Sequence, residues 1–146
     1  LARVGGRQPA ALALDVVESP HDVTGDVPGV VRFGGVDLSA AQARYRRLRT
    51  EHPDARILVD LDVHLAHDAR TARGEALAAA VAPRPDTLRY VGTPAGLAGL
   101  IADIVAAGVA DGVTVRHVLD RARDRVVRTV TTEVAPLLDT RTARAS

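Results

Sequence analysis

The sequence contains no cysteine, methionine, tryptophan or lysine, and only three of its 146 residues are aromatic. Without cysteine the chain can form no disulfide bond, thiolate metal site or cysteine nucleophile. The three aromatic residues, Phe33, Tyr45 and Tyr90, are too few for a base-stacking nucleic-acid platform. There is also no apolar run near the roughly 18 residues that a membrane span needs, and no signal-peptide pattern. We therefore expect a cytoplasmic protein with neither nucleic acid nor membrane as a partner.

Positive and negative charges are nearly balanced, since 19 arginines and 18 acidic residues leave a formal net charge of +1. So small a net charge creates no overall field to attract nucleic acid, and the arginines between Arg44 and Arg49 are interpreted as the solvent-facing side of a helix. A hydrophobic fraction of 47% with 25% charged residues is typical of a globular domain. We expect a single α/β domain over residues 1–146, with a frayed polar tail at residues 140–146.

Short apolar segments alternate with segments of helical periodicity along the chain. Ala11–Val17 is almost continuously apolar, which is typical of a strand buried on both faces of a parallel sheet. Ile57–Leu65 alternates between apolar and mixed positions, which indicates a strand with two different faces. Further strands are predicted at Val30–Phe33 and Gly112–Val115, and helices from Ser39 to before Pro53, from Asp68 to about Val81, from Thr93 to Gly108, and from Leu119 to Pro136. This alternation predicts a parallel α/β architecture.

The segment of residues 90–115, YVGTPAGLAGLIADIVAAGVADGVTV, carries the most informative pattern. A Gly-Thr-Pro helix start, an amphipathic helix, Ala-Gly, Asp-Gly and a hydrophobic strand follow one another in this order. The segment resembles the C-terminal signature of luciferase-like flavin-dependent monooxygenases, and Val134–Leu137 is similar to their final helix. The resemblance extends from Arg56 to Leu138. It implies an oxidoreductase that uses FMN or a deazaflavin coenzyme on a small-molecule substrate.

The same resemblance implies a partial TIM-type (β/α) barrel, roughly its last four strands, with a parallel sheet and flanking helices. A complete barrel of this type needs about 250 residues, whereas this chain has 146. We therefore expect a C-terminal barrel fragment that lacks half of the barrel wall. Because active sites of such barrels gather residues from strand ends around the whole rim, we expect little flavin binding and no turnover from this chain alone.

Ser19 and His21 are the candidate cofactor-binding residues, because the corresponding loop of many relatives helps to hold the flavin phosphate. That loop uses small residues and glycines in the family, whereas Glu18 and Asp22 flank the two candidates here. Carboxylates beside a phosphate are unfavourable, and no glycine lets backbone donors approach it. An ordinary exposed loop histidine is the alternative interpretation of His21.

Asp62 and His64 are the candidate catalytic residues. They share one face of the predicted strand Ile57–Leu65, and in a closed barrel that face points into the lumen near the active-site end. There they could contact substrate or position a proton. The alternative is that the face is solvated because the barrel is incomplete. A metal site would require His64, His67 and Asp68 to converge, and two histidines alone are a weak signal, so we expect no metal.

A second function is compatible with the same residues. A barrel fragment has open edge strands, and open edges invite pairing with another chain. The alternative to the oxidoreductase is therefore a non-catalytic, degenerate half-barrel that acts as a dimerisation or interaction module. In that case we expect a homodimer that forms through the open barrel edges.

Overall fold

The structure is a computed structural model that describes residues 11–14 and 29–145. Within these residues a five-stranded, all-parallel sheet forms the centre of the molecule. Its strands are β1 (Ala11–Leu14), β2 (Val30–Phe33), β3 (Arg56–Leu65), β4 (Leu88–Gly92) and β5 (Gly112–His117). The four predicted strands are confirmed where they are described, while residues 15–17 of the first one lie outside the described residues. β4 was not predicted.

The long strand β3 organises the sheet. Its first half pairs with β2 and its second half with β4, so these two short strands follow one another along one edge. Residues 58–63 of β3 pair with β5 along the other edge. The remaining edge of β5 pairs with β1, so the first described strand lies beside the last. In a closed barrel whose strands follow one another in sequence order, the first and last strands are also neighbours.

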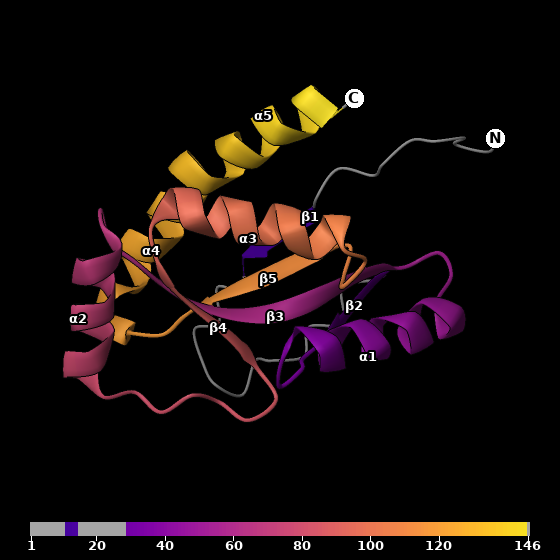
Figure 1. Ribbon diagram of the computed structural model, residues 1–146, viewed down its shortest axis with the longest axis horizontal. Helices are drawn as coiled ribbons and strands as arrows, with labels where there is room; N and C mark the ends of the chain where they lie inside the picture. The colour runs from indigo at the N-terminus through magenta and orange to yellow at the C-terminus, as the bar shows by residue number, and fades with distance from the viewer. Residues whose placement is uncertain (1–10, 15–28, 146) are drawn as a thin grey trace.

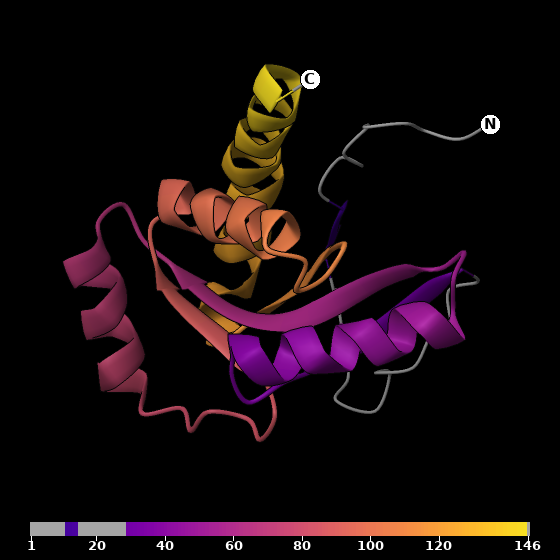
Figure 2. The same cartoon turned by 45° about the vertical axis from the view of Figure 1, so that its right-hand side comes forward.

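Helices connect the parallel strands and flank the sheet (Figure 1). They are α1 (Leu38–Glu51), α2 (Ala69–Ala79), α3 (Pro94–Ala106), α4 (Arg123–Thr129) and α5 (Ala135–Ala145). Both ribbon views place α1 alongside β3 and α2 beyond the carboxyl end of β3 (Figures 1 and 2). The predicted α/β class, a parallel sheet flanked by helices in a partial TIM-type arrangement, is confirmed. No helix in the described part of the chain is long and apolar enough to cross a membrane.

Side-chain caps determine where the connecting helices begin. The Asp68 carboxylate accepts a hydrogen bond from the Thr71 amide, and Thr93 Oγ1 accepts one from Gly96, as the sequence predicts. For the first helix, Ser39 with Gln42 three residues later predicts a capping box, and this prediction is wrong. Asp37 caps that helix two residues earlier by accepting from the Ala40 amide. Aspartate and serine are about equally good caps, so local sequence alone does not choose between them.

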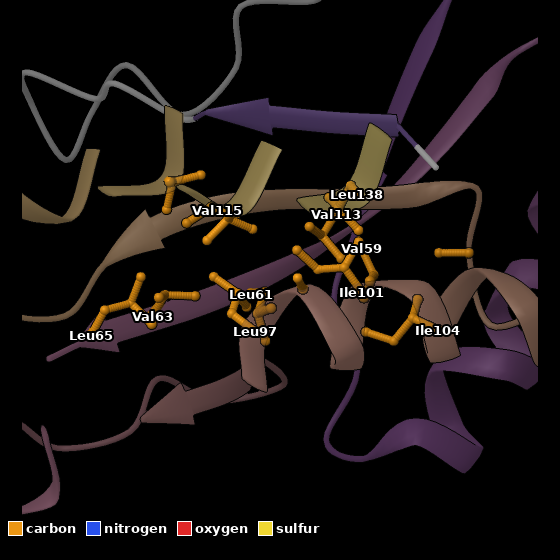
Figure 3. Close-up of a cluster of buried hydrophobic side chains, with 14 of the residues drawn as sticks. Val59, Leu61, Val63, Leu65, Leu97, Ile101, Ile104, Val113, Val115 and Leu138 are labelled. Atoms are coloured by element: carbon orange, nitrogen blue, oxygen red, sulfur yellow. The ribbon is translucent and has the colours of Figure 1, made fainter. Parts of the chain in front are cut away.

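The core lies on the face of the sheet formed by odd-numbered residues of β3. Figure 3 shows side chains of β3, α3 and β5 converging there. Leu97, Ile101 and Ile104 of α3 are at most 2% exposed, which confirms the predicted apolar face of this helix, although Leu100 is only half-buried. Leu12 of β1 and several residues of α1 also pack against this cluster.

The last helix continues further than the sequence predicts. Ala122, Val126, Val130 and Val134 follow one another at a spacing of four residues along one side of this helix, and all four are buried. A spacing of four residues drifts by about 40° per step on an α-helix, and the wider π-helical turn at Val130–Val134 offsets this drift. The helix does not end at Pro136 but runs on to Ala145. Residues 140–145 are therefore helical, and their fraying stays a prediction.

The π-helical turn also explains why a proline is tolerated inside this helix. The Ala135 amide donates to the carbonyl of Val130, five residues back, so the regular four-residue ladder is already interrupted at this point. Proline has no amide hydrogen to donate. Pro136 therefore costs little helix stability, because the regular hydrogen-bond ladder is already shifted just before it.

Tyr90 explains why glycine stands at position 92, in the Gly-Thr-Pro signature, and at position 96, two residues after it. A Cβ atom on Gly92 would lie 2.4 Å from the Tyr90 hydroxyl oxygen, and one on Gly96 only 2.1 Å from it. The Tyr90 hydroxyl donates a hydrogen bond to the Thr93 carbonyl, which holds the ring in this place. The signature thus combines a helix cap with a niche for an aromatic ring.

We predict that Gly96→Ala lowers the free energy of unfolding by about 1–2 kcal/mol, because the new methyl group overpacks the niche. Urea denaturation followed by circular dichroism measures the loss. In a Tyr90→Ala background most of this cost should disappear, since the hydroxyl oxygen at 2.1 Å is gone and the nearest remaining atom, Thr93 Oγ1, lies at 3.2 Å. An equal cost in both backgrounds would show that Tyr90 is not the reason for the glycine.

Candidate functional site

The candidate site is the face of the sheet opposite the core, which we name the inner face. It carries Asp60, Asp62 and His64 of β3. Paired residues of parallel strands point to the same side of a sheet, so Arg32 of β2 and Thr114 of β5 lie on this face beside them. The structure therefore confirms that the two candidate catalytic residues share a face.

Asp62 is engaged by an arginine from a loop. Arg84, between Pro83 and Pro85 in the connection from α2 to β4, donates from Nε to the carboxylate at 2.8 Å and makes a second hydrogen bond from Nη2. The Asp62 side chain is 9% exposed and that of Arg84 is 38% exposed. Two parallel hydrogen bonds fix a carboxylate both electrostatically and geometrically. The carboxylate is therefore an oriented, neutralised group rather than a free base.

The loop that carries Arg84 is itself held in place. Arg89 donates to the Val81 carbonyl at 2.9 Å. The Asp86 carbonyl oxygen lies so close to the β2–α1 turn that a Cβ on Gly34 would come within 2.3 Å of it. Arg84 is thus presented to Asp62 by a loop that is anchored on both sides.

His64 is fully buried and belongs to a second polar cluster. Its Nε2 lies 3.3 Å from the Glu75 carboxylate of α2, which also accepts from Arg125 of α4 at 3.4 Å. Partial burial raises the pKa of Glu75, but the hydrogen bond from His64 and the charge of Arg125 outweigh it, so the pKa lies below its usual range. Glu75 is therefore an ionised acceptor at neutral pH.

The inner face also contains two buried polar atoms, His64 Nδ1 and Thr114 Oγ1, that have no hydrogen-bond partner among the described residues. Thr114 is 2% exposed and His64 is 0% exposed. This part of the face is therefore buried rather than solvated, contrary to the alternative interpretation of the sequence. An unsatisfied buried polar group costs about 1–3 kcal/mol. Because two such groups lie on the same face, we infer that they form hydrogen bonds with donors or acceptors outside the described residues.

The histidines do not converge on a metal position. His67 Nε2 lies 2.7 Å from the Asp68 carboxylate and its side chain is 81% exposed, whereas the buried His64 faces Glu75. Among the residues that the structure describes, no three histidine, aspartate or glutamate side chains gather closely enough to hold a metal ion. The candidate cofactor-binding residues Ser19 and His21 lie outside the described residues.

A separate polar cluster joins the amino ends of β3 and β5. The Asp111 carboxylate accepts from the Tyr45 hydroxyl at 2.7 Å, from Arg49, and from the Ile57 amide at 2.9 Å. Burial, together with the hydrogen bond to Asp111, raises the pKa of Tyr45. Residues at the amino ends of the strands of a (β/α) barrel usually serve stability rather than catalysis, and we interpret this cluster as a structural clamp.

Comparison with solved structures places this architecture among known folds. The riboflavin lyase RcaE, solved with modified FMN and riboflavin, aligns with 77% of this chain at a TM-score of 0.62 and 14% identity. The long-chain alkane monooxygenase LadA aligns at 0.61 with 12% identity, and the EDTA monooxygenase EmoA from Chelativorans sp. BNC1 at 0.58 with 13% identity, each over 77% of the chain. The chain therefore shares part of the fold of these three proteins.

The alignments cover 37–40% of the length of these three proteins, so the chain spans about two fifths of them. No protein-family model and no curated protein matches the sequence. At 12–14% identity the likeness shows the fold alone, so any chemistry has to be argued from the residues of the inner face.

Proposed function

We propose that this chain forms the C-terminal wall of a luciferase-like flavin-dependent oxidoreductase, and that it contributes the inner face to a shared active site. The observation that carries the proposal is the buried inner face with its two unpartnered atoms, His64 Nδ1 and Thr114 Oγ1. In a (β/α) barrel this face borders the lumen where the active site lies. The fold of RcaE, LadA and EmoA supports the same assignment.

A flavin fits the described residues only in part. The unpartnered nitrogen of His64 and hydroxyl of Thr114 suit the polar atoms of a flavin ring or of a substrate. A bound flavin, whether FMN or a deazaflavin, supplies the redox chemistry, and the protein supplies binding and orientation. We assign no phosphate site within residues 11–14 and 29–145. Asp62, held by Arg84, would contribute a fixed dipole to the lumen rather than a proton acceptor.

We expect the 146-residue chain alone to show no monooxygenase turnover and to bind FMN with a dissociation constant well above about 1 μM, or roughly −8 kcal/mol. The chain spans about two fifths of the three similar proteins, so many of the contacts that would position a ligand would have to come from other residues, and a flexible remainder does not replace pre-positioned contacts. Flavin fluorescence titration measures this. The matched sample is the chain extended at its amino terminus by whatever residues its gene encodes there.

The extended protein should bind FMN or a deazaflavin tightly if the proposal is correct. Upstream residues that form an unrelated domain, or an extended protein without flavin binding, would overturn it. Tight binding by the 146-residue chain would show instead that the pocket is complete without the other half.

The alternative function, a dimerising half-barrel, is supported by one specific observation. The outer edges of β1, β2 and β4 have no strand paired to them among the described residues. Open parallel edges favour association with another chain. Light scattering on the titration samples separates the two functions, because a stable monomer at micromolar concentration removes the dimer.

A further inference from the structure

The buried imidazole of His64 has two nitrogens in different surroundings. Nε2 lies 3.3 Å from the Glu75 carboxylate, whereas Nδ1 has no hydrogen-bond partner within residues 11–14 and 29–145. An ionised carboxylate can only accept, so the contact at Nε2 requires a proton on that nitrogen. A proton on Nδ1 as well would place a charged ring with an unpaired donor in a fully buried position, which is costly. The neutral Nε2–H form satisfies both constraints.

Glu75 is well placed to impose this form. It projects from α2, is 33% exposed, and is held by Arg125 of α4, whose Nη2 also lies 3.4 Å from the Leu65 carbonyl. The carboxylate is therefore fixed between two helices and the carboxyl end of β3. A histidine with one nitrogen bound to a fixed carboxylate presents the other nitrogen as a directed acceptor.

We propose that Glu75 is a positioning residue, which holds His64 as the Nε2–H tautomer and leaves Nδ1 as the acceptor for an O–H or N–H group of the ligand. This inference rests on the proposed function, since it takes the inner face to be part of a ligand site. A group that releases its proton to Nδ1 keeps the electron pair, and the imidazolium formed is balanced by the Glu75 carboxylate. Glu75 itself does not touch the ligand.

Nitrogen-15 NMR of the histidine rings in the 146-residue chain tests the proposal without any ligand or activity. The His64 ring, assigned through its backbone, should carry its proton on Nε2, and this proton should be protected from exchange. Glu75→Gln should preserve both features, because the amide oxygen can still accept. Glu75→Met cannot accept, so the ratio of Nε2–H to Nδ1–H forms should fall by about tenfold or more, the factor of one charged hydrogen bond.

Glu133→Met, at an exposed position of the last helix, is the matched control and should leave the His64 signals unchanged. A wild-type ring protonated on Nδ1 overturns the proposal even if every variant fails to fold. Unchanged His64 signals in Glu75→Met also overturn it, because a Glu75 with a merely structural role would leave the tautomer alone. The flavin titration reports on the proposed function separately, so the two can fail independently.

Discussion

Leu97→Ala should lower the free energy of unfolding by about 2–5 kcal/mol, the range observed when a buried leucine is truncated. Leu97 is 0% exposed and faces β3 from the first turns of α3, where it meets residues such as Leu61 in the core cluster (Figure 3). The substitution removes buried apolar atoms and leaves a cavity that a close-packed interior fills poorly. Urea unfolding followed by circular dichroism gives the value directly.

Leu77→Ala supplies the matched control for this experiment. This substitution also replaces a leucine by alanine within a helix, but the Leu77 side chain is 82% exposed. We expect that variant to lose less than about 0.5 kcal/mol, as exposed sites do. Similar losses at Leu97 and Leu77 would mean that α3 does not pack on the sheet as described, and the fold assignment would then be wrong.

The strands and helices that the sequence predicts best are those whose pattern repeats over many residues. Ile57–Leu65 alternates five times, and the structure extends it by only one residue to Arg56. Thr93-Pro94 and Asp68 have specific capping chemistry, and both helices begin there. β4 has only five residues and follows a loop with two prolines, so its local sequence does not distinguish it from a continuation of that loop. It forms because the second half of β3 offers an unpaired edge.

In the candidate site, too, the features that follow from a local sequence pattern were predicted and those that depend on distant residues were not. Alternation along β3 predicted that Asp62 and His64 share a face, and this is confirmed. Their partners were not predicted, because Arg84 lies 22 residues from Asp62 and Glu75 lies 11 residues from His64. Such contacts depend on how a loop and a helix return over the end of the sheet. The two prolines that flank Arg84 restrict the backbone around it, but they do not indicate which residue it contacts.

The ion pair of Arg84 and Asp62 leads to the other large expected effect. Removing one partner of a buried pair costs about 3–5 kcal/mol, because the remaining charge stays buried without compensation. Asp62 is 9% exposed, but Arg84 is 38% exposed and water can reach its guanidinium. We therefore expect Arg84→Met to lower the free energy of unfolding by about 2–3 kcal/mol, somewhat less than for a fully buried pair. Arg73→Met, at an exposed position of α2, should be nearly neutral.

The double variant Asp62→Asn with Arg84→Met distinguishes a charge effect from a simple loss of packing. Asparagine has nearly the shape of aspartate but no charge, so burying it without the arginine costs only a neutral polar group. Most of the loss in Arg84→Met should therefore be recovered when Asp62 is also changed, and thermal and urea unfolding of the four proteins give this coupling directly. No recovery in the double variant would show that the uncompensated charge of Asp62 is not the reason for the loss in Arg84→Met, and that the guanidinium stabilises the protein through its other contacts.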